Sequence, residues 1–116
     1  MAAPSEQTKT IVDIELARHL DANEHRWPDL DDVLFSWRGS YGYLTAVFTN
    51  GQRTRLARIG HTGDPDTWDF ALYDPATDTY TPTRLTTGDF HGTIAEVFDT
   101  AALTHLTEQS QDREQN

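Results

Sequence analysis

The chain has 116 residues, of which 19 are acidic and nine are Lys or Arg, so its formal net charge is −10. This length fits one domain with one hydrophobic core. The absence of cysteine excludes disulfides, a thiol nucleophile and any metal site with Cys ligands.

The charge is spread unevenly along the chain. Residues 1–32 carry a net charge of −5 and residues 64–116 carry −9, whereas residues 33–63 contain four arginines and no acid. Only one of the nine basic residues is a lysine, a bias typical of GC-rich bacterial coding sequences. An acidic protein is repelled by nucleic acid and by anionic membranes unless its charge is segregated in this way. The segregation is therefore the starting point for the functional hypotheses.

Residues 1–9 are polar and are predicted to form a disordered tail. They show no basic region followed by an apolar stretch, the pattern of a signal peptide. No apolar stretch of the chain is long enough to span a bilayer. The sequence therefore predicts a cytoplasmic protein that does not enter a membrane.

Residues 10–23 are predicted to form a helix. Apolar residues recur here at a spacing of four: Val12, Leu16 and Leu20. Thr10 followed by Asp13 approximates a capping box, which predicts that the helix begins at Thr10. The alternation of apolar and acidic residues around Ile14 leaves a strand as the alternative.

Five antiparallel strands are predicted in the middle of the chain. They are expected at residues 33–37, 41–49, 52–59, 67–74 and 79–85. Gly39-Ser40 suits a type II′ turn, and Asn50-Gly51 suits a two-residue turn in which both residues have positive φ. Pro82 cannot donate a ladder hydrogen bond, so the last strand is expected at a sheet edge.

A second helix is predicted from Thr93 to Leu106, with Thr93 and Glu96 as a capping box. Its apolar stripe consists of Ile94, Val97, Phe98, Ala101, Ala102 and Leu106. Residues 108–116 are predicted to be a second disordered tail. The expected fold is α+β over residues 10–107: a single antiparallel meander of about five strands, with the N-terminal and C-terminal helices packed on one face.

The stretch from Gly60 to Phe70 contains one histidine and three aspartates: His61, Asp64, Asp66 and Asp69. Their spacing fits neither a calcium loop, which needs Gly at the sixth position and Glu at the twelfth, nor a zinc site with paired histidines. The sequence predicts a polar hairpin loop whose Asp side chains bind backbone amides, with no metal and no cofactor.

The first functional hypothesis rests on an acidic cluster before the sheet, formed by Glu24, Asp29, Asp31 and Asp32. A surface of this kind complements a basic protein partner and speeds its association. The sequence predicts a small interaction protein, such as an inhibitor, an immunity-like antidote or a regulator. A solvated, solubilising face is the alternative interpretation of the same residues.

The second hypothesis rests on the acid-free segment. A two-residue turn at Asn50-Gly51 pairs Phe48 with Arg53, Ala46 with Arg55 and Tyr43 with Arg58. Arg53 and Arg55 are then expected on one sheet face and Arg58 on the other. Together with Trp37, Arg38 and Tyr41 near the first turn, these residues resemble a surface that binds anions or single-stranded nucleic acid by charge and stacking.

In an alternative interpretation, aspartates on the neighbouring strand neutralise these arginines. A short loop after the third strand is expected to pair Arg58 with Asp69 and Arg53 with Asp74 as cross-strand salt bridges. A third hypothesis, a small hydrolase, needs a pocket in which His and Asp converge, and the five histidines are scattered along the chain. A sheet face without helices also offers a homodimer surface.

Overall fold

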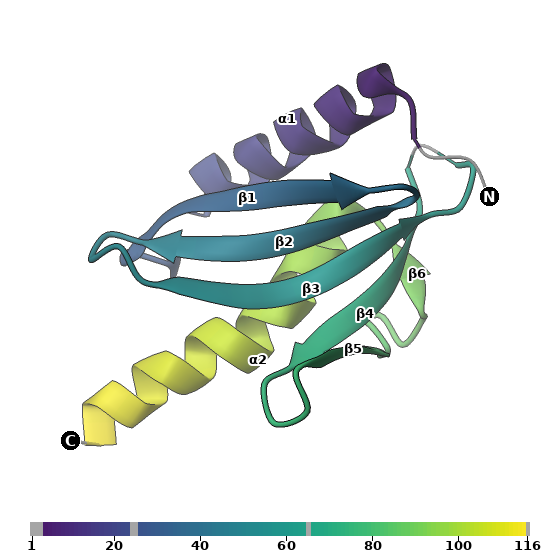
Figure 1. Ribbon diagram of the computed structural model, residues 1–116. Helices are drawn as coiled ribbons and strands as arrows, with labels where there is room; N and C mark the ends of the chain where they lie inside the picture. Colours follow the sequence, from purple (N-terminus) through teal and green to yellow (C-terminus); the bar gives the residue numbers. More distant parts are fainter. Residues whose placement is uncertain (1–3, 24–25, 65, 116) are drawn as a thin grey trace.

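Two helices lie on one face of an antiparallel sheet, and neither of them covers the other face (Figure 1). The computed structural model describes residues 4–23, 26–64 and 66–115, without side chains for residues 107–115. The elements in chain order are α1 (Glu6–Ala22), β1 (Leu30–Arg38), β2 (Tyr41–Phe48), β3 (Arg53–His61), β4 (Trp68–Asp74), β5 (Thr79–Pro82), β6 (His91–Gly92) and α2 (Ile94–Gln115). The predicted α+β fold is confirmed.

The sheet is the predicted meander, with strand order β1-β2-β3-β4-β5. Pro82 pairs with Ala71 at the end of β5, and β5 is an edge strand, as its proline predicts. The short strand β6 pairs with β4 through Gly92 and His91. Its two residues are too few for a sequence pattern, so this strand was not predicted.

The turn between β2 and β3 is one residue longer than predicted. Phe48 N–H donates to the Gln52 carbonyl at 2.9 Å, and Gly51 N–H donates to the Phe48 carbonyl at 2.9 Å. Gly51 has φ +88°, whereas the φ of Asn50 is not positive. The loop therefore contains three residues, and Arg53 pairs with Val47 instead of Phe48.

A β-bulge in β3 then shifts the register back. Thr45 pairs with Arg55 and Leu44 pairs with Ala57, so Leu56 is an extra residue without a partner on β2. Leu56 and Ala57 are both fully buried. The bulge restores the predicted pairing of Tyr43 with Arg58. It also places Arg58 on the same face as Arg53 and Arg55, so the prediction that Arg58 lies on the opposite face is wrong.

The core lies between the covered sheet face and the helices. All six residues of the predicted α2 stripe are buried. The Thr93–Glu96 capping box is confirmed, because Thr93 N–H donates to Glu96 Oε1 at 2.9 Å and Glu96 N–H donates to Thr93 Oγ1 at 3.3 Å. The helix continues to Gln115, past the predicted end at Leu106. Glu, Gln and Arg in this segment are good helix formers, which explains the extension.

Helix α1 begins four residues earlier than predicted. Ser5 is its N-cap and accepts a hydrogen bond from Thr8 N–H at 3.1 Å. Residues 6–9 therefore belong to the helix and not to a tail. His19 Nε2 lies 2.7 Å from Asp99 Oδ1 and links α1 to α2. Within the described part of the chain, no helix combines the length and apolar character that a membrane crossing needs.

Candidate functional site

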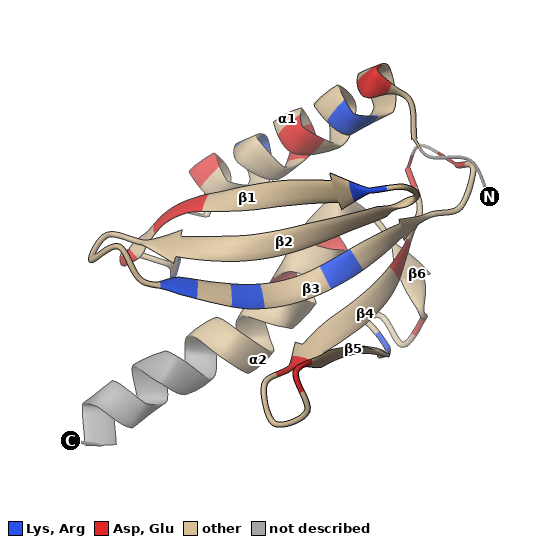
Figure 2. Cartoon of the chain, in the orientation of Figure 1, with Lys and Arg blue, Asp and Glu red and all other residues tan. Residues whose placement is uncertain are grey.

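The four arginines of the acid-free segment share the sheet face that the helices leave uncovered. Strand alternation and the register place Arg38 beside Tyr41, Arg58 beside Tyr43, Arg55 beside Thr45 and Arg53 beside Val47. We call this surface the arginine face: Arg38, Arg53, Arg55 and Arg58. Figure 2 shows the three β3 arginines in a row along the strand.

Arg58 lies against two tyrosine rings. Its guanidinium carbon lies 4.5 Å from the centroid of the Tyr41 ring and 5.9 Å from that of the Tyr80 ring. Stacking on a ring stabilises a guanidinium and leaves its N–H groups available at the rim of the plane. The half-buried Arg58 is therefore oriented before any ligand arrives.

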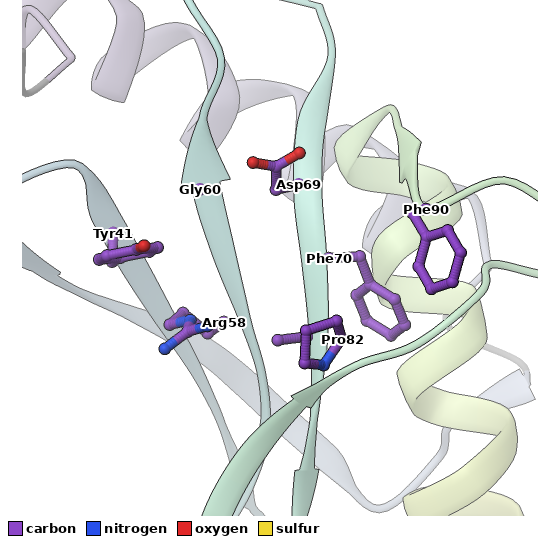
Figure 3. Close-up of a pocket in the computed structure, with 8 residues that line it drawn as sticks. Tyr41, Arg58, Gly60, Asp69, Phe70, Pro82 and Phe90 are labelled. Carbon is purple, nitrogen blue, oxygen red and sulfur yellow. The ribbon is translucent and has the colours of Figure 1, made fainter. Parts of the chain in front are cut away.

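A pocket of about 330 Å³ lies next to Arg58 (Figure 3). It is lined by Tyr41, Arg58, Gly60, Asp69, Phe70, Ala71, Pro82 and Phe90. A Cβ at Gly60 would lie 3.2 Å from Asp69 Cβ and 3.3 Å from Tyr41 Cε1. The glycine therefore keeps open the space between Tyr41 and Asp69. The size is at the lower end for a small-molecule site.

The predicted salt bridges between β3 and β4 do not form. The register pairs Arg58 with Ala71 and Gly60 with Asp69, and the β3–β4 ladder begins at Ala57, so Arg53 lies beyond it. Among the described residues, no carboxylate forms an ion pair with Arg53 or Arg58.

The carboxylates of the uncovered face have other partners. Asp69 Oδ1 lies 2.9 Å from His91 Nε2, and Asp78 Oδ1 lies 3.1 Å from Arg55 Nη1. Arg55 and Asp78 are both more than half exposed, and exposed ion pairs are weak, so a stronger anion can displace Asp78.

Three tyrosines form a cluster beside the arginines. The Tyr80 ring centroid lies 5.2 Å from those of both Tyr43 and Tyr73. Tyr73 Oη donates to Asp78 Oδ1 at 2.7 Å. This hydrogen bond to a carboxylate raises the pKa of Tyr73, and burial raises the pKa of Tyr80.

Replacing Asp78 with asparagine is expected to lower the pKa of Tyr73. Asparagine tolerates the positive φ of this position (+53°) and removes the negative charge that holds the phenol protonated. Because the folded-state pKa exceeds the ordinary 10.0, the hydrogen bond adds stability below pH 10 that is lost as pH rises through the raised value. An ultraviolet titration of phenolate absorbance measures the shift.

Tyr73→Phe is the control for this titration, because it removes the transition that is assigned to Tyr73. An unchanged titration curve in the Asp78→Asn variant would contradict the assigned cause of the raised pKa.

The structure brings most of the predicted sheet-face residues together. Arg38, Tyr43 and the three β3 arginines share one face. Trp37 does not join them, because it alternates with Arg38 and lies on the covered face. There it stacks on Phe35 with ring centroids 5.5 Å apart.

Several residues of the site were not predicted. They are Gly60, Tyr73, Asp78, Tyr80 and Phe90. The sequence signal for an aromatic site was the alternating tyrosines of β2 and the tyrosines that flank the β4–β5 turn. Whether these two groups of tyrosines meet depends on the register of strands that are not adjacent.

The predicted acidic surface lies at the start of β1. Asp31 and Asp32 are exposed, and Asp21 of α1 lies near them around a recess of about 110 Å³. The Asp29 carbonyl accepts from Thr49 N–H at 2.9 Å and so helps to hold the β2–β3 turn. Glu24, the fourth residue of this prediction, lies outside the described residues.

In the loop between β3 and β4, Asp64 bonds a backbone amide as predicted, whereas Asp69 lies in β4 and pairs with His91. Asp64 Oδ1 accepts from Asp66 N–H at 2.9 Å, and Thr62 Oγ1 donates to the Thr67 carbonyl at 2.8 Å. His61 packs against Trp68, with ring centroids 5.6 Å apart. His61, Thr62 and Asp64 therefore stabilise the β3–β4 hairpin.

Comparison of the chain with protein-family models, with curated proteins and with solved structures gives no match. The geometry of the two surfaces is thus the basis for a functional proposal.

Proposed function

We propose that the arginine face binds single-stranded nucleic acid. The observation that carries this proposal is Arg58, whose guanidinium stacks on Tyr41 beside a pocket and has no carboxylate partner among the described residues. An oriented guanidinium is suited to a phosphate oxygen, because its planar N–H groups match the geometry of that anion.

The spacing of the arginines supports a ligand longer than one nucleotide. Arg53 and Arg58 are five positions apart on one strand, which corresponds to about 16 Å. Arg55 lies between them on the same face. A single-stranded backbone can place successive phosphates along such a row, and its unpaired bases can stack on exposed rings such as Tyr41.

The net charge of −10 limits the expected affinity. Repulsion from the acidic parts of the chain opposes long-range attraction of a polyanion. Binding is therefore expected to depend on close contacts with the arginines and to weaken strongly as salt screens them. A base-paired duplex hides the base faces that the tyrosines need, so it should bind more weakly than a single strand.

Fluorescence anisotropy with a labelled single-stranded oligothymidylate tests this proposal. Each phosphate contact on a single strand contributes about −0.7 to the slope of log K against log salt, so engagement of all four arginines predicts a slope near −2.8. A duplex of the same length and thymidine monophosphate are the comparison ligands. Binding of the monophosphate as tight as that of the oligomer would assign the site to a single nucleotide, and absence of binding to all three would refute the proposal.

A second candidate function is binding of a basic protein at the acidic start of β1. The observation in its favour is that Asp21, Asp31 and Asp32 converge from α1 and β1 around one recess. Such a surface favours fast, salt-sensitive association with a cationic partner. The two candidates use different surfaces, so one chain can have both activities.

A further inference from the structure

Strand β1 is an edge of the sheet, and α1 runs alongside it (Figure 1). In an antiparallel pair, alternate residues direct both backbone groups toward or away from the partner strand. Val33 N–H donates to Asp32 Oδ1 at 2.8 Å, which places Val33 among the residues whose backbone groups point away from β2. By the same alternation, the backbone N–H and C=O groups of Phe35 and Trp37 also point away from β2.

A groove of about 560 Å³ lies between this strand and α1. We call it the α1–β1 groove; it is lined by Glu6, Lys9, Thr10, Asp13 and Ala17 of α1 and by Asp32, Val33, Leu34, Phe35 and Trp37 of β1. Three carboxylates face one ammonium in it. Lys9 Nζ already lies 3.2 Å from Glu6 Oε2, so Asp13 and Asp32 remain as the uncompensated charges of the lining.

A groove between an edge strand and a helix is the geometry in which an extended peptide adds one strand to a sheet. Main-chain hydrogen bonds supply affinity in that mode, and alternate side chains supply specificity. Here the helix side of the groove is acidic, while the exposed Leu34 lies on the opposite side of the strand. An occupant with alternating basic and apolar residues complements both sides.

A second copy of this chain fits the same edge less well. Symmetric pairing of two β1 strands would bring two α1 helices side by side. Helix α1 carries four acids, namely Glu6, Asp13, Glu15 and Asp21, against Lys9 and Arg18. Repulsion between the two helices opposes this arrangement.

We propose that a basic, extended peptide segment of a protein partner binds in the α1–β1 groove by adding a strand to β1. The inference rests on the second candidate function and gives its basic partner a binding mode. Peptide residues opposite Phe35 and Trp37 would place their side chains on the α1 side of the sheet, because paired residues share a sheet face. Their backbone N–H groups would point toward β1, because the backbone groups of Phe35 and Trp37 point toward the peptide. The basic side chains of the segment therefore belong at these positions.

A synthetic peptide of alternating lysine and valine, capped at both ends and as long as β1 (nine residues), is the probe. The full-length protein is titrated with it by calorimetry. Methylation of the lysine amides is expected to weaken binding at least about tenfold, because these N–H groups face β1 and each lost hydrogen bond costs affinity. Methylation of the valine amides, which face solvent, should leave affinity within about twofold.

Asp13→Asn is expected to weaken binding about two- to fivefold, as an exposed charge pair is modest in strength. Glu15→Gln, a change of the same charge on α1 away from the groove lining, is the matched control. If both methylated peptides bind equally well, strand addition is wrong, although the surface still binds basic ligands. Absence of binding by the unmodified peptide would overturn both strand addition and the binding of a basic protein at this surface. A protein dimer that the peptide does not dissociate would assign the β1 edge to a second copy of the chain.

Discussion

Replacing Arg58 with alanine is expected to weaken binding of a single-stranded oligonucleotide by about 10- to 100-fold. A hydrogen bond to a charged group contributes about 1.5–3 kcal/mol. Arg58 is half-buried against two tyrosine rings and has no carboxylate partner among the described residues. The stacked ring of Tyr41, 4.5 Å from its guanidinium carbon, holds it beside the pocket. Anisotropy titrations at constant salt measure the change.

Two further variants separate orientation from charge. Arg18→Ala removes the same charge from an exposed position on α1 and should leave the affinity nearly unchanged. Arg58→Lys keeps the charge but loses the planar group that stacks and binds in a bidentate manner, so an intermediate affinity is expected. Equal losses in the Arg18 and Arg58 variants would show that net charge, and not the arginine face, determines binding.

Replacing Leu56 with alanine is expected to lower the free energy of unfolding by about 2–5 kcal/mol, the range for a buried leucine. Leu56 is the extra residue of the β3 bulge, and its side chain is fully buried against the core. A small domain has about 5–15 kcal/mol of total stability, so this variant should still fold but melt at lower denaturant concentration. Chemical denaturation followed by tryptophan fluorescence gives the value.

Leu103→Ala is the matched control, because this leucine is 47% exposed on α2 and its truncation should cost less than about 1 kcal/mol. The folded Leu56→Ala protein should bind the oligonucleotide with nearly unchanged affinity, since Leu56 points away from the arginine face. A loss of stability no larger than that of Leu103→Ala would show that the bulge is not anchored in the core as we describe.

The sequence predicted those parts of the fold that depend on neighbouring residues. The apolar stripe of α2, its Thr93–Glu96 capping box and the positions of five strands all follow from local periodicity and hydrogen bonding. The start of α1 was misplaced because two capping signals compete there. Ser5 bonds Thr8 N–H, while the Thr10 hydroxyl donates to the Glu6 carbonyl inside the helix.

The candidate site was only partly predictable. The segregation of four arginines in one acid-free segment is visible in the sequence. The salt bridges expected from these arginines to Asp69 and Asp74 required a β3–β4 register that differs from the one in the structure. Tyr80 reaches Arg58 although β4 lies between β5 and β3, and no spacing along the chain encodes such a contact.

The sequence by itself determined the strand order, the helix faces and the local concentration of positive charge, because each of these depends on residues a few positions apart. Only the tertiary structure decided which sheet face carries Arg58. A two-residue periodicity assigns Arg55 and Arg58 to opposite faces, and the burial of both Leu56 and Ala57 overrides it. The bulge adds one residue to β3 so that the core accepts both side chains, and three arginines then share the uncovered face.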